Sequence, residues 1–172
     1  TENTKVVLNA EYFKDERVAD RGIPSFKGRP FNTNASTFFG DPNRSPAESE
    51  LKAANALIEH KFDNEVTIRN RTRFATQDKF YQNVYPNAVN AAGTEVAINA
   101  YNDTTQRDNF FNQTDLLFSL NTGAVKHDLV VGLEIGHQDT SNLRKTGFFN
   151  NTTTSVNAPT NNPITAVPIT FR

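Results

Sequence analysis

Hydrophobic and polar side chains alternate with a period of two along several stretches of this chain. The alternation is regular in Lys5–Phe13, Glu65–Phe74, Asn109–Leu120 and His127–Gln138. Successive side chains of a β-strand point to opposite faces of the sheet. Each stretch therefore predicts a strand, with a more apolar face and a more polar or small face.

The stretch Leu51–Phe62 fits two periods. Four of its apolar residues share one helical face: Leu51, Ala54, Leu57 and Ile58. Ser45-Pro46 followed by two glutamates is also a fair helix start. Alternation fits equally well, although local propensity by itself favours a helix. Because Asp63-Asn64 is a hairpin connector and a strand follows it, we expect a strand.

Long irregular segments separate these strands. Lys14–Ser49 is punctuated by proline and glycine, Val84–Asp108 is a second expected loop, and Ser141–Arg172 is a third, entering a further strand at its end, Ile169–Phe171. The other connections, Asp63-Asn64 and Asn121–Gly123, are tight turns. Strands of this length with short turns at one end and long loops at the other are typical of outer-membrane barrels. We expect an all-β fold of antiparallel up-and-down strands, part of a large transmembrane β-barrel with short periplasmic turns and long external loops.

Composition excludes several functions. The 172 residues suffice for one domain. The chain has 18 basic and 19 acidic residues, so a general nucleic-acid-binding surface, which requires a strongly basic face, is not expected. Without cysteine there is no disulfide, zinc-thiolate site or thiol nucleophile. No apolar run approaches the ~20 residues of a membrane helix. Because the chain lacks methionine and shows no signal peptide, we expect a mature or excised piece.

Catalytic and metal-binding patterns are weak. The histidines, His60, His127 and His137, are scattered, and none has the HExxH spacing of a zinc site. There is no G-x-S-x-G nucleophile turn and no glycine loop that would cradle phosphate. The sequence predicts no enzyme, no resident metal and no cofactor.

Several stretches resemble the barrel of TonB-dependent ferric-siderophore receptors, and the nearest branch is the catecholate type. They are DERVADRGIPSFKGRPF (15–31), STFFGDPNRS (36–45), RNRTRF…DKFYQNVYPNAVNAAGT (69–94), QRDNFFNQTDL (106–116) and VVGLEIGHQDTSN (130–142). The resemblance covers nearly the whole chain. It implies that residues 1–172 form about five strands of a roughly 22-stranded barrel, without the plug domain and the TonB box.

The resemblance also implies a function. Such a receptor lies in the bacterial outer membrane among lipid and lipopolysaccharide, binds a ferric-siderophore at its external rim and imports it with energy from the TonB complex, which acts through the plug. Iron enters only as part of the bound ferric-siderophore.

Cations and aromatic rings in the expected loops are the candidate ligand contacts, because charge-assisted hydrogen bonds and ring contacts suit a bulky anionic chelate. The candidates are Arg21, Phe26, Arg29, Phe39, Arg44, Tyr81, Tyr85, Arg144 and Phe148. These residues could instead pack the loops together or, for the arginines, bind lipopolysaccharide phosphate.

A row of cations occupies one face of the Glu65–Phe74 strand: Arg69, Arg71 and Arg73. The row could contact ligand. We favour a barrel wall facing the plug, in which acids on neighbouring strands, such as Glu59, Asp115 or Glu134, pair with the arginines.

Two other functions stay open. A soluble all-β binding or adhesion module would pack the apolar positions of residues 129–135 against those of residues 110–118 in a dry core, whereas a barrel would turn them to lipid. A barrel for another cargo, such as cobalamin or a glycan, is the other possibility, since fold does not fix substrate.

Overall fold

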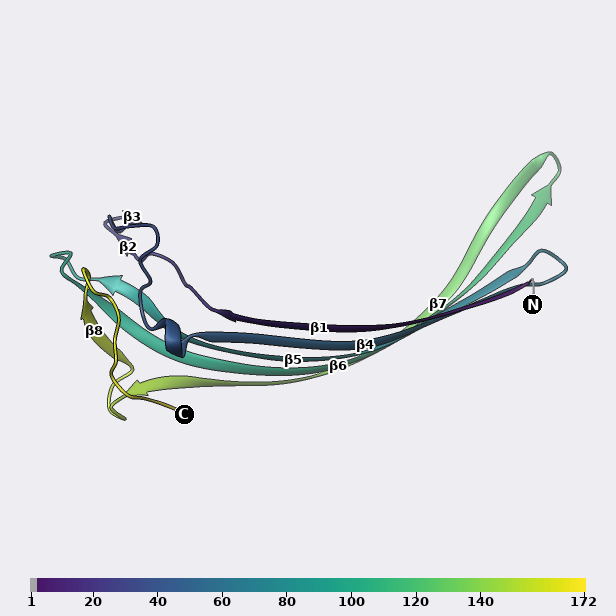
Figure 1. The fold of residues 1–172 in the computed structure, drawn as a ribbon. Helices are drawn as coiled ribbons and strands as arrows, with labels where there is room; N and C mark the ends of the chain where they lie inside the picture. Colours follow the sequence, from purple (N-terminus) through teal and green to yellow (C-terminus); the bar gives the residue numbers. More distant parts are fainter. Residues whose placement is uncertain (1–2) are drawn as a thin grey trace. The chain divides into compact units, whose positions relative to one another are not determined.

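The computed structural model describes residues 3–172. Its long strands follow one another along the chain (Figure 1): β1 (Thr4–Val18), β4 (Pro46–Lys61), β5 (Thr67–Val89), β6 (Glu95–Thr122) and β7 (Val125–Phe149). Neighbours in the sequence are also neighbours in the sheet, and β9 (Ile169–Phe171) pairs antiparallel with the end of β7. The all-β, antiparallel up-and-down fold is thus confirmed.

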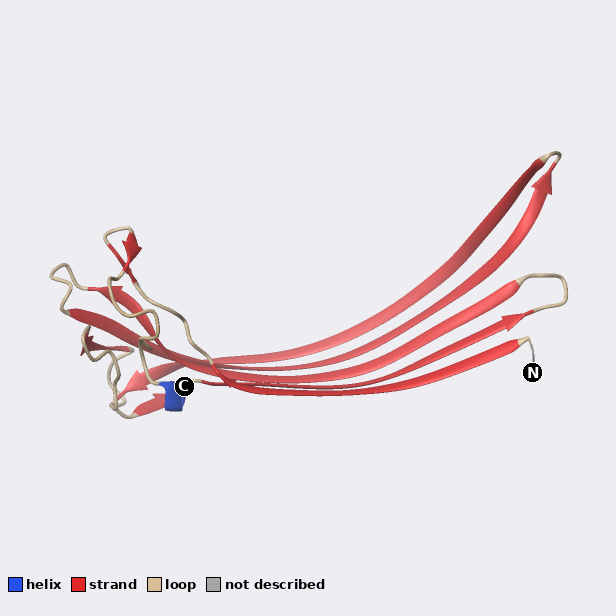
Figure 2. Ribbon diagram, turned by 45° about the horizontal axis from the view of Figure 1, so that its top comes forward, coloured by secondary structure: helices blue, strands red, loops and turns tan. Residues whose placement is uncertain are grey.

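The smaller elements belong to the connections (Figure 2). β2 (Ser25–Phe26) and β3 (Arg29–Pro30) form a small antiparallel hairpin, and a single 3-10 turn, η1 (Pro42–Arg44), precedes β4. β8 (Ser155–Pro159) pairs antiparallel with the start of β6. Within residues 3–172, no helix is long and apolar enough to cross a membrane.

The ambiguous stretch 51–62 lies in a strand, as predicted. β4 is hydrogen-bonded between β1 and β5 along the sheet. Its alanines and Leu57 are good helix formers, but pairing on both edges satisfies the backbone without a helix, so tertiary context overrides local propensity.

The chain divides into two compact units. The first unit comprises residues 3–13, Glu50–Gln77 and Gln106–Ser141, and the second comprises Lys14–Ser49, Asp78–Thr105 and Asn142–Arg172. The long strands contribute residues to both units.

The first unit contains the two short turns that the sequence predicts. Between β4 and β5, the Phe62 amide donates to the Val66 carbonyl at 2.8 Å, and Glu65 has a positive φ of 64°. Between β6 and β7, Gly123 (φ 62°) supplies the left-handed conformation that a two-residue hairpin turn requires. Both predicted tight turns are confirmed.

Several large apolar side chains of the first unit are exposed. On β7, Val131 is 58% exposed, Leu133 67% and Ile135 57%. A sandwich would bury these positions against the apolar positions of β6 in a dry core. The first unit is instead a single sheet layer, so the arrangement that the soluble module required is absent from it.

The second unit has a hydrophobic core of its own. Its most buried apolar members are Phe39, Val84, Val96, Ile98, Ala100, Phe149 and Ala158. Phe39 comes from the first connection and shares this core with Val96 and Ile98 of β6, whereas Ala158 of β8 lies beside Val96 in the sheet.

The prediction of a long second loop at 84–108 is wrong. β5 continues to Val89 and β6 begins at Glu95, which leaves only a tight turn between them. Asn90 closes this turn, because its carbonyl accepts from Gly93 N at 2.9 Å and its side chain from Thr94 N at 2.9 Å. Burial of Val96 and Ile98 in the core of the second unit favours strand continuation over a free loop.

The third predicted loop is shorter than expected, because β7 extends to Phe149. At its end, the Cβ of a residue larger than glycine at Gly147 would lie 2.6 Å from the Cβ of Ala100, so glycine permits close packing of β7 on β6. The strand predicted at Ile169–Phe171 is confirmed as β9. The first connection is irregular over most of its length, as predicted, although β1 runs on to Val18 and β4 begins at Pro46.

Candidate functional site

Three tyrosines gather at the start of β6 and the end of β5. The ring of Tyr101 meets Tyr81 edge-on, with centroids 5.9 Å apart, and Tyr85 likewise at 5.4 Å. Tyr81 and Tyr85 are four residues apart on one strand, so they share a face and flank Tyr101 on the neighbouring strand. Edge-to-face geometry at these distances is favourable for aromatic rings.

Two arginines approach the same Tyr101 ring. The guanidinium carbon of Arg144, from β7, lies 3.9 Å from the ring centroid, and that of Arg21 lies 5.7 Å away. Arg21 also donates to the Tyr101 hydroxyl, and its Nε donates to Asn83 Oδ1 at 3.0 Å. We call Arg21, Tyr81, Tyr85, Tyr101 and Arg144 the Tyr101 cluster. It combines aromatic faces with two permanent positive charges.

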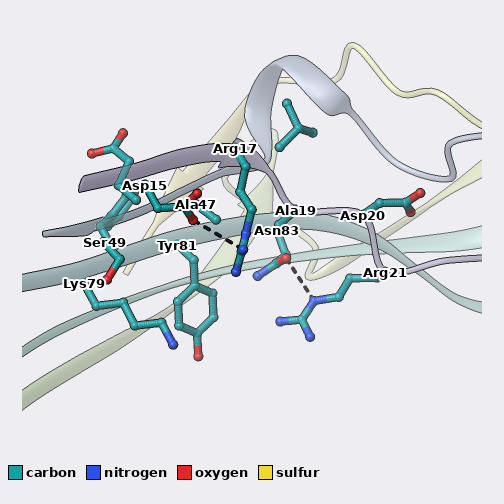
Figure 3. Close-up of a pocket in the computed structure, with 13 residues that line it drawn as sticks. Asp15, Arg17, Ala19, Asp20, Arg21, Ala47, Ser49, Lys79, Tyr81 and Asn83 are labelled. Atoms are coloured by element: carbon teal, nitrogen blue, oxygen red, sulfur yellow. Dashed lines mark hydrogen bonds and ion pairs between the residues drawn. The ribbon is translucent and has the colours of Figure 1, made fainter. Parts of the chain in front are cut away.

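A cleft of about 670 Å³ adjoins the cluster (Figure 3). It is lined by β1, β4, β5 and the segment after β1, and it shares Arg21 and Tyr81 with the cluster. Six of its lining residues carry a formal charge at neutral pH: Asp15, Arg17, Asp20, Arg21, Glu48 and Lys79. We call it the charged cleft.

Several charges of the cleft are engaged locally. Arg17 forms an ion pair with Asp15 at 3.3 Å, and Asp20 accepts from the Gly22 amide at 2.8 Å. The Lys79 ammonium lies 5.4 Å from the Tyr81 ring centroid. Three cations face three carboxylates, so the cleft as a whole presents no strong net charge.

The structure brings four of the candidates from sequence together: Arg21, Tyr81, Tyr85 and Arg144. Sequence reasoning missed their centre, Tyr101, and the adjacent Asn83. Both lie in or next to the segment that was expected to be a loop. A strand prediction for residues 95–108 would have placed Tyr101 on the same face as Asp103 and Arg107. Ala100 and Asn102 would lie on the opposite face.

Two other candidates hold the second unit together. Phe39 is only 1% exposed and belongs to the hydrophobic core. Arg44 forms an ion pair with Asp41 at 2.5 Å and donates to the carbonyls of Val167 and Thr165 at 2.6 Å each. These contacts fix the third connection on the first one and occupy the guanidinium.

The remaining candidates lie outside the Tyr101 cluster. Phe26 is in the β2–β3 hairpin, where its ring meets Phe31 edge-on at 5.8 Å, and Arg29 is exposed on β3. Phe148, near the end of β7, has the guanidinium carbon of Arg172 4.1 Å from its ring centroid.

The arginine row on β5 lies in the first unit, where acids on neighbouring strands pair with it. The pairs are Arg69 with Glu59 at 2.6 Å, Arg71 with Asp115 at 3.3 Å and Arg73 with Glu11 at 3.4 Å. Glu59 and Asp115 are the partners that the sequence predicted. Glu134 shares a small cleft with Arg71 and Arg73. The charges of the row are therefore largely balanced by the sheet itself.

Metal-binding groups are sparse in the part of the chain that the structure describes. No cluster of three or more histidine, aspartate or glutamate side chains there could hold a metal ion.

Curated proteins with a similar sequence include a probable siderophore receptor, a metal-pseudopaline receptor and a ferrioxamine B receptor. The chain is 25% identical over 187 aligned residues to a probable TonB-dependent siderophore receptor, PiuA, of Acinetobacter baumannii, which covers 93% of the chain and 25% of that protein. It is 24% identical to the metal-pseudopaline receptor CntO of Pseudomonas aeruginosa, over 77% of the chain and 19% of the receptor. It is 31% identical to the ferrioxamine B receptor of Salmonella typhimurium, over 87% of the chain and 21% of the receptor.

The chain is a distant homologue of TonB-dependent siderophore and metallophore receptors. It spans about a quarter or less of the length of these curated relatives. No family model matches the sequence.

Proposed function

We propose that this chain is part of an outer-membrane receptor that imports a ferric-siderophore with energy from the TonB complex. The chain contributes barrel wall and external connections to that receptor. Coupling to the TonB complex runs through a segment of the receptor outside these residues. The distant homology to siderophore and metallophore receptors supports the class of protein.

Strand length and face polarity support the membrane location. β5, β6 and β7 have 23, 28 and 25 residues, more than twice the ~9–11 that a tilted strand needs to cross a bilayer. In the first unit, one sheet face carries the balanced arginine row, and the other carries exposed Leu8, Leu116 and Leu133. We assign the charged face to the barrel interior and the apolar face to lipid.

The Tyr101 cluster is the observation that carries the ligand assignment. Two arginine guanidiniums and three tyrosine rings converge there from β5, β6, β7 and the first connection. An iron chelate with flat rings and negative charge can be held by such a group, because rings stack on rings while guanidiniums bind the acidic oxygens. A catecholate chelate is the cargo that fits these contacts best.

Binding by the full-length receptor in detergent tests this proposal. Titration calorimetry would compare iron-loaded and iron-free forms of catecholate and hydroxamate siderophores. We expect saturable binding of at least one iron-loaded form and weaker binding of its iron-free form. Uptake of radioactive iron by cells under iron limitation, with and without a functional TonB complex, tests the energy source. A receptor that bound none of these chelates would contradict the proposal.

A further inference from the structure

One amide donor of the second unit has no partner. Asn83, on β5, is 0% exposed, and its Nδ2 donates to no acceptor within residues 3–172. The amide orientation is fixed by its other end, because Oδ1 accepts from Arg21 Nε at 3.0 Å and a guanidinium can only donate. Turning the amide over would face its NH₂ toward Arg21, so Nδ2 is a genuine unpaired donor.

Buried donors are nearly always satisfied, since leaving one unpaired costs the free energy of desolvation without a compensating bond. The residues on either side of Asn83 are well bound: Val84 N donates to Ser45 Oγ at 3.1 Å, and Gln82 Nε2 donates to the Arg44 carbonyl at 2.8 Å. The backbone is thus held in place at this point. The unpaired donor is a property of this fixed position and not of a loose segment.

Asn83 is one of the residues that line the charged cleft. Figure 3 shows its nitrogen directed away from Arg21, toward the side of the cleft where Arg17 and Tyr81 lie. Asn83 is also bonded to Arg21 of the Tyr101 cluster, so it links the cluster to the cleft. A polar oxygen that entered the cleft could complete its hydrogen bonding.

The charges of the cleft indicate what kind of oxygen that is. Its three cations are accompanied by Asp15, Asp20 and Glu48, which would repel a strongly anionic group. Arg17 is already paired with Asp15, and Arg21 with Asn83 and Tyr101. The Lys79 ammonium lies over the Tyr81 ring. The buried donor that stays unpaired is the neutral carboxamide of Asn83. A neutral acceptor, such as an amide carbonyl, matches it without an uncompensated charge.

We propose that Asn83 recognises a neutral amide carbonyl of the bound chelate, and so discriminates amide-bearing chelates from chelates with the same iron core and no amide. This inference rests on the proposed receptor function. Because Nδ2 has no exposed surface, a lining side chain must turn aside for the carbonyl to reach it. Arg17 is suited to this, since it is 71% exposed and its pair with Asp15 is an exposed one, of little energetic consequence.

Two ferric chelates test the proposal on the full-length receptor. Ferric tris(dihydroxybenzamide) and ferric tris(catechol) have the same iron core and differ by the carboxamide. We expect the wild-type receptor to prefer the first, and Asn83→Asp to lower the ratio of the two affinities about tenfold, as for loss of one good hydrogen bond. The aspartate retains the acceptor for Arg21 and puts a carboxylate oxygen in place of the donor. Its charge acts alike on the iron core of both chelates, so that part of its effect cancels in the ratio.

Asn121→Asp is the matched control, because Asn121 is exposed at the end of β6 in the first unit. It should leave the ratio unchanged. Asn83→Leu, which is neutral, gives a second variant should the aspartate disturb folding, and it should also abolish the preference. A wild-type ratio near one, or equal losses for both chelates in the variants, would overturn the inference while leaving the receptor function standing. A wild-type receptor that bound neither chelate would reject catecholate transport and this inference together.

Discussion

The guanidinium carbon of Arg144 lies 3.9 Å from the centroid of the Tyr101 ring. Arg144 is on β7 and Tyr101 on β6, so the contact joins neighbouring strands of the sheet. With Arg21 near the same ring, it places two positive charges at one aromatic side chain. This contact is the basis of the ligand assignment.

Replacing Arg144 by alanine should weaken ferric-siderophore binding to the full-length receptor by about threefold to thirtyfold. The range corresponds to a cation–π contact of about 0.5–2 kcal/mol, together with any direct bond from the guanidinium to the chelate. Titration calorimetry measures it. The adjacent exposed cation, Lys145, points to the opposite face of the strand, so Lys145→Ala is the control and should change the affinity less than twofold. Equal losses for the two variants would show a general charge effect instead.

Asp115→Ala should destabilise the receptor more than Glu11→Ala. The Asp115 side chain is only 8% exposed and accepts from both Arg71 and Gln113, whereas the pair of Glu11 with Arg73 is half-exposed. We expect a loss of about 1–3 kcal/mol in the free energy of unfolding for the first and less than about 1 kcal/mol for the second. Urea unfolding in detergent, followed by circular dichroism, measures both. Similar losses would mean that burial does not distinguish these carboxylates.

Gly40→Ala should disrupt the second unit. Gly40 has a φ of 129°, and an added Cβ would lie 1.8 Å from the carbonyl oxygen of Val84, which is backbone and cannot move aside. Gly22, with a φ of 79° and open space around it, isolates the cost of the backbone conformation alone. We expect Gly22→Ala to cost about 1–2 kcal/mol and Gly40→Ala clearly more. Limited proteolysis of the first connection, in parallel with urea unfolding, would show the difference, and equal behaviour would contradict the close approach.

Asn70 and Asn112 form a polar pair on the face that we assign to lipid. The amide of Asn70 donates to Asn112 Oδ1 at 3.1 Å, that of Asn112 donates back at 3.2 Å, and Thr72 and Thr114 accept the other donors. Replacing Asn70 alone by leucine leaves the Asn112 amide short of partners, at an expected cost of about 1–3 kcal/mol.

The double variant, with leucine at both positions, should recover most of that stability, because an apolar pair suits a lipid-facing surface. A double-mutant cycle in detergent or bilayers therefore measures the coupling between the two asparagines. Additive losses from the two single variants, with no recovery in the double variant, would argue against a lipid environment for this face.

Alternation was sufficient to predict most of the sheet. It identified the strands around Leu8, Arg71, Leu116 and Val131, because in a single sheet layer each face meets one environment and the pattern is uninterrupted. It also predicted that acids across the sheet would pair with the arginine row. The prediction failed for residues 84–108. Pro86 and Gly93 indicated a loop there, although β5 and β6 continue through most of the segment.

That failure also explains what was missed at the candidate site. Tyr101 carries no motif, and once its segment is treated as loop it has no assigned face. Asn83 could not have been singled out, since its distinction is an unpaired Nδ2 in a buried position. Neither burial nor hydrogen-bond satisfaction is a property of one segment; both depend on which other segments pack against it.

The sequence by itself determined the class of fold, the two tight turns and the resemblance to a family of chelate receptors, because period-two patterning and turn chemistry act over neighbouring residues. Only the tertiary structure decided where the strands end, since Phe39 and Ala158, from distant parts of the chain, belong to the core in which Val96 and Ile98 are buried. It also decided that Arg21 and Arg144, 123 positions apart, share the ring of Tyr101. The register between strands determines which side chains lie next to one another, and the packing of the whole sheet fixes that register.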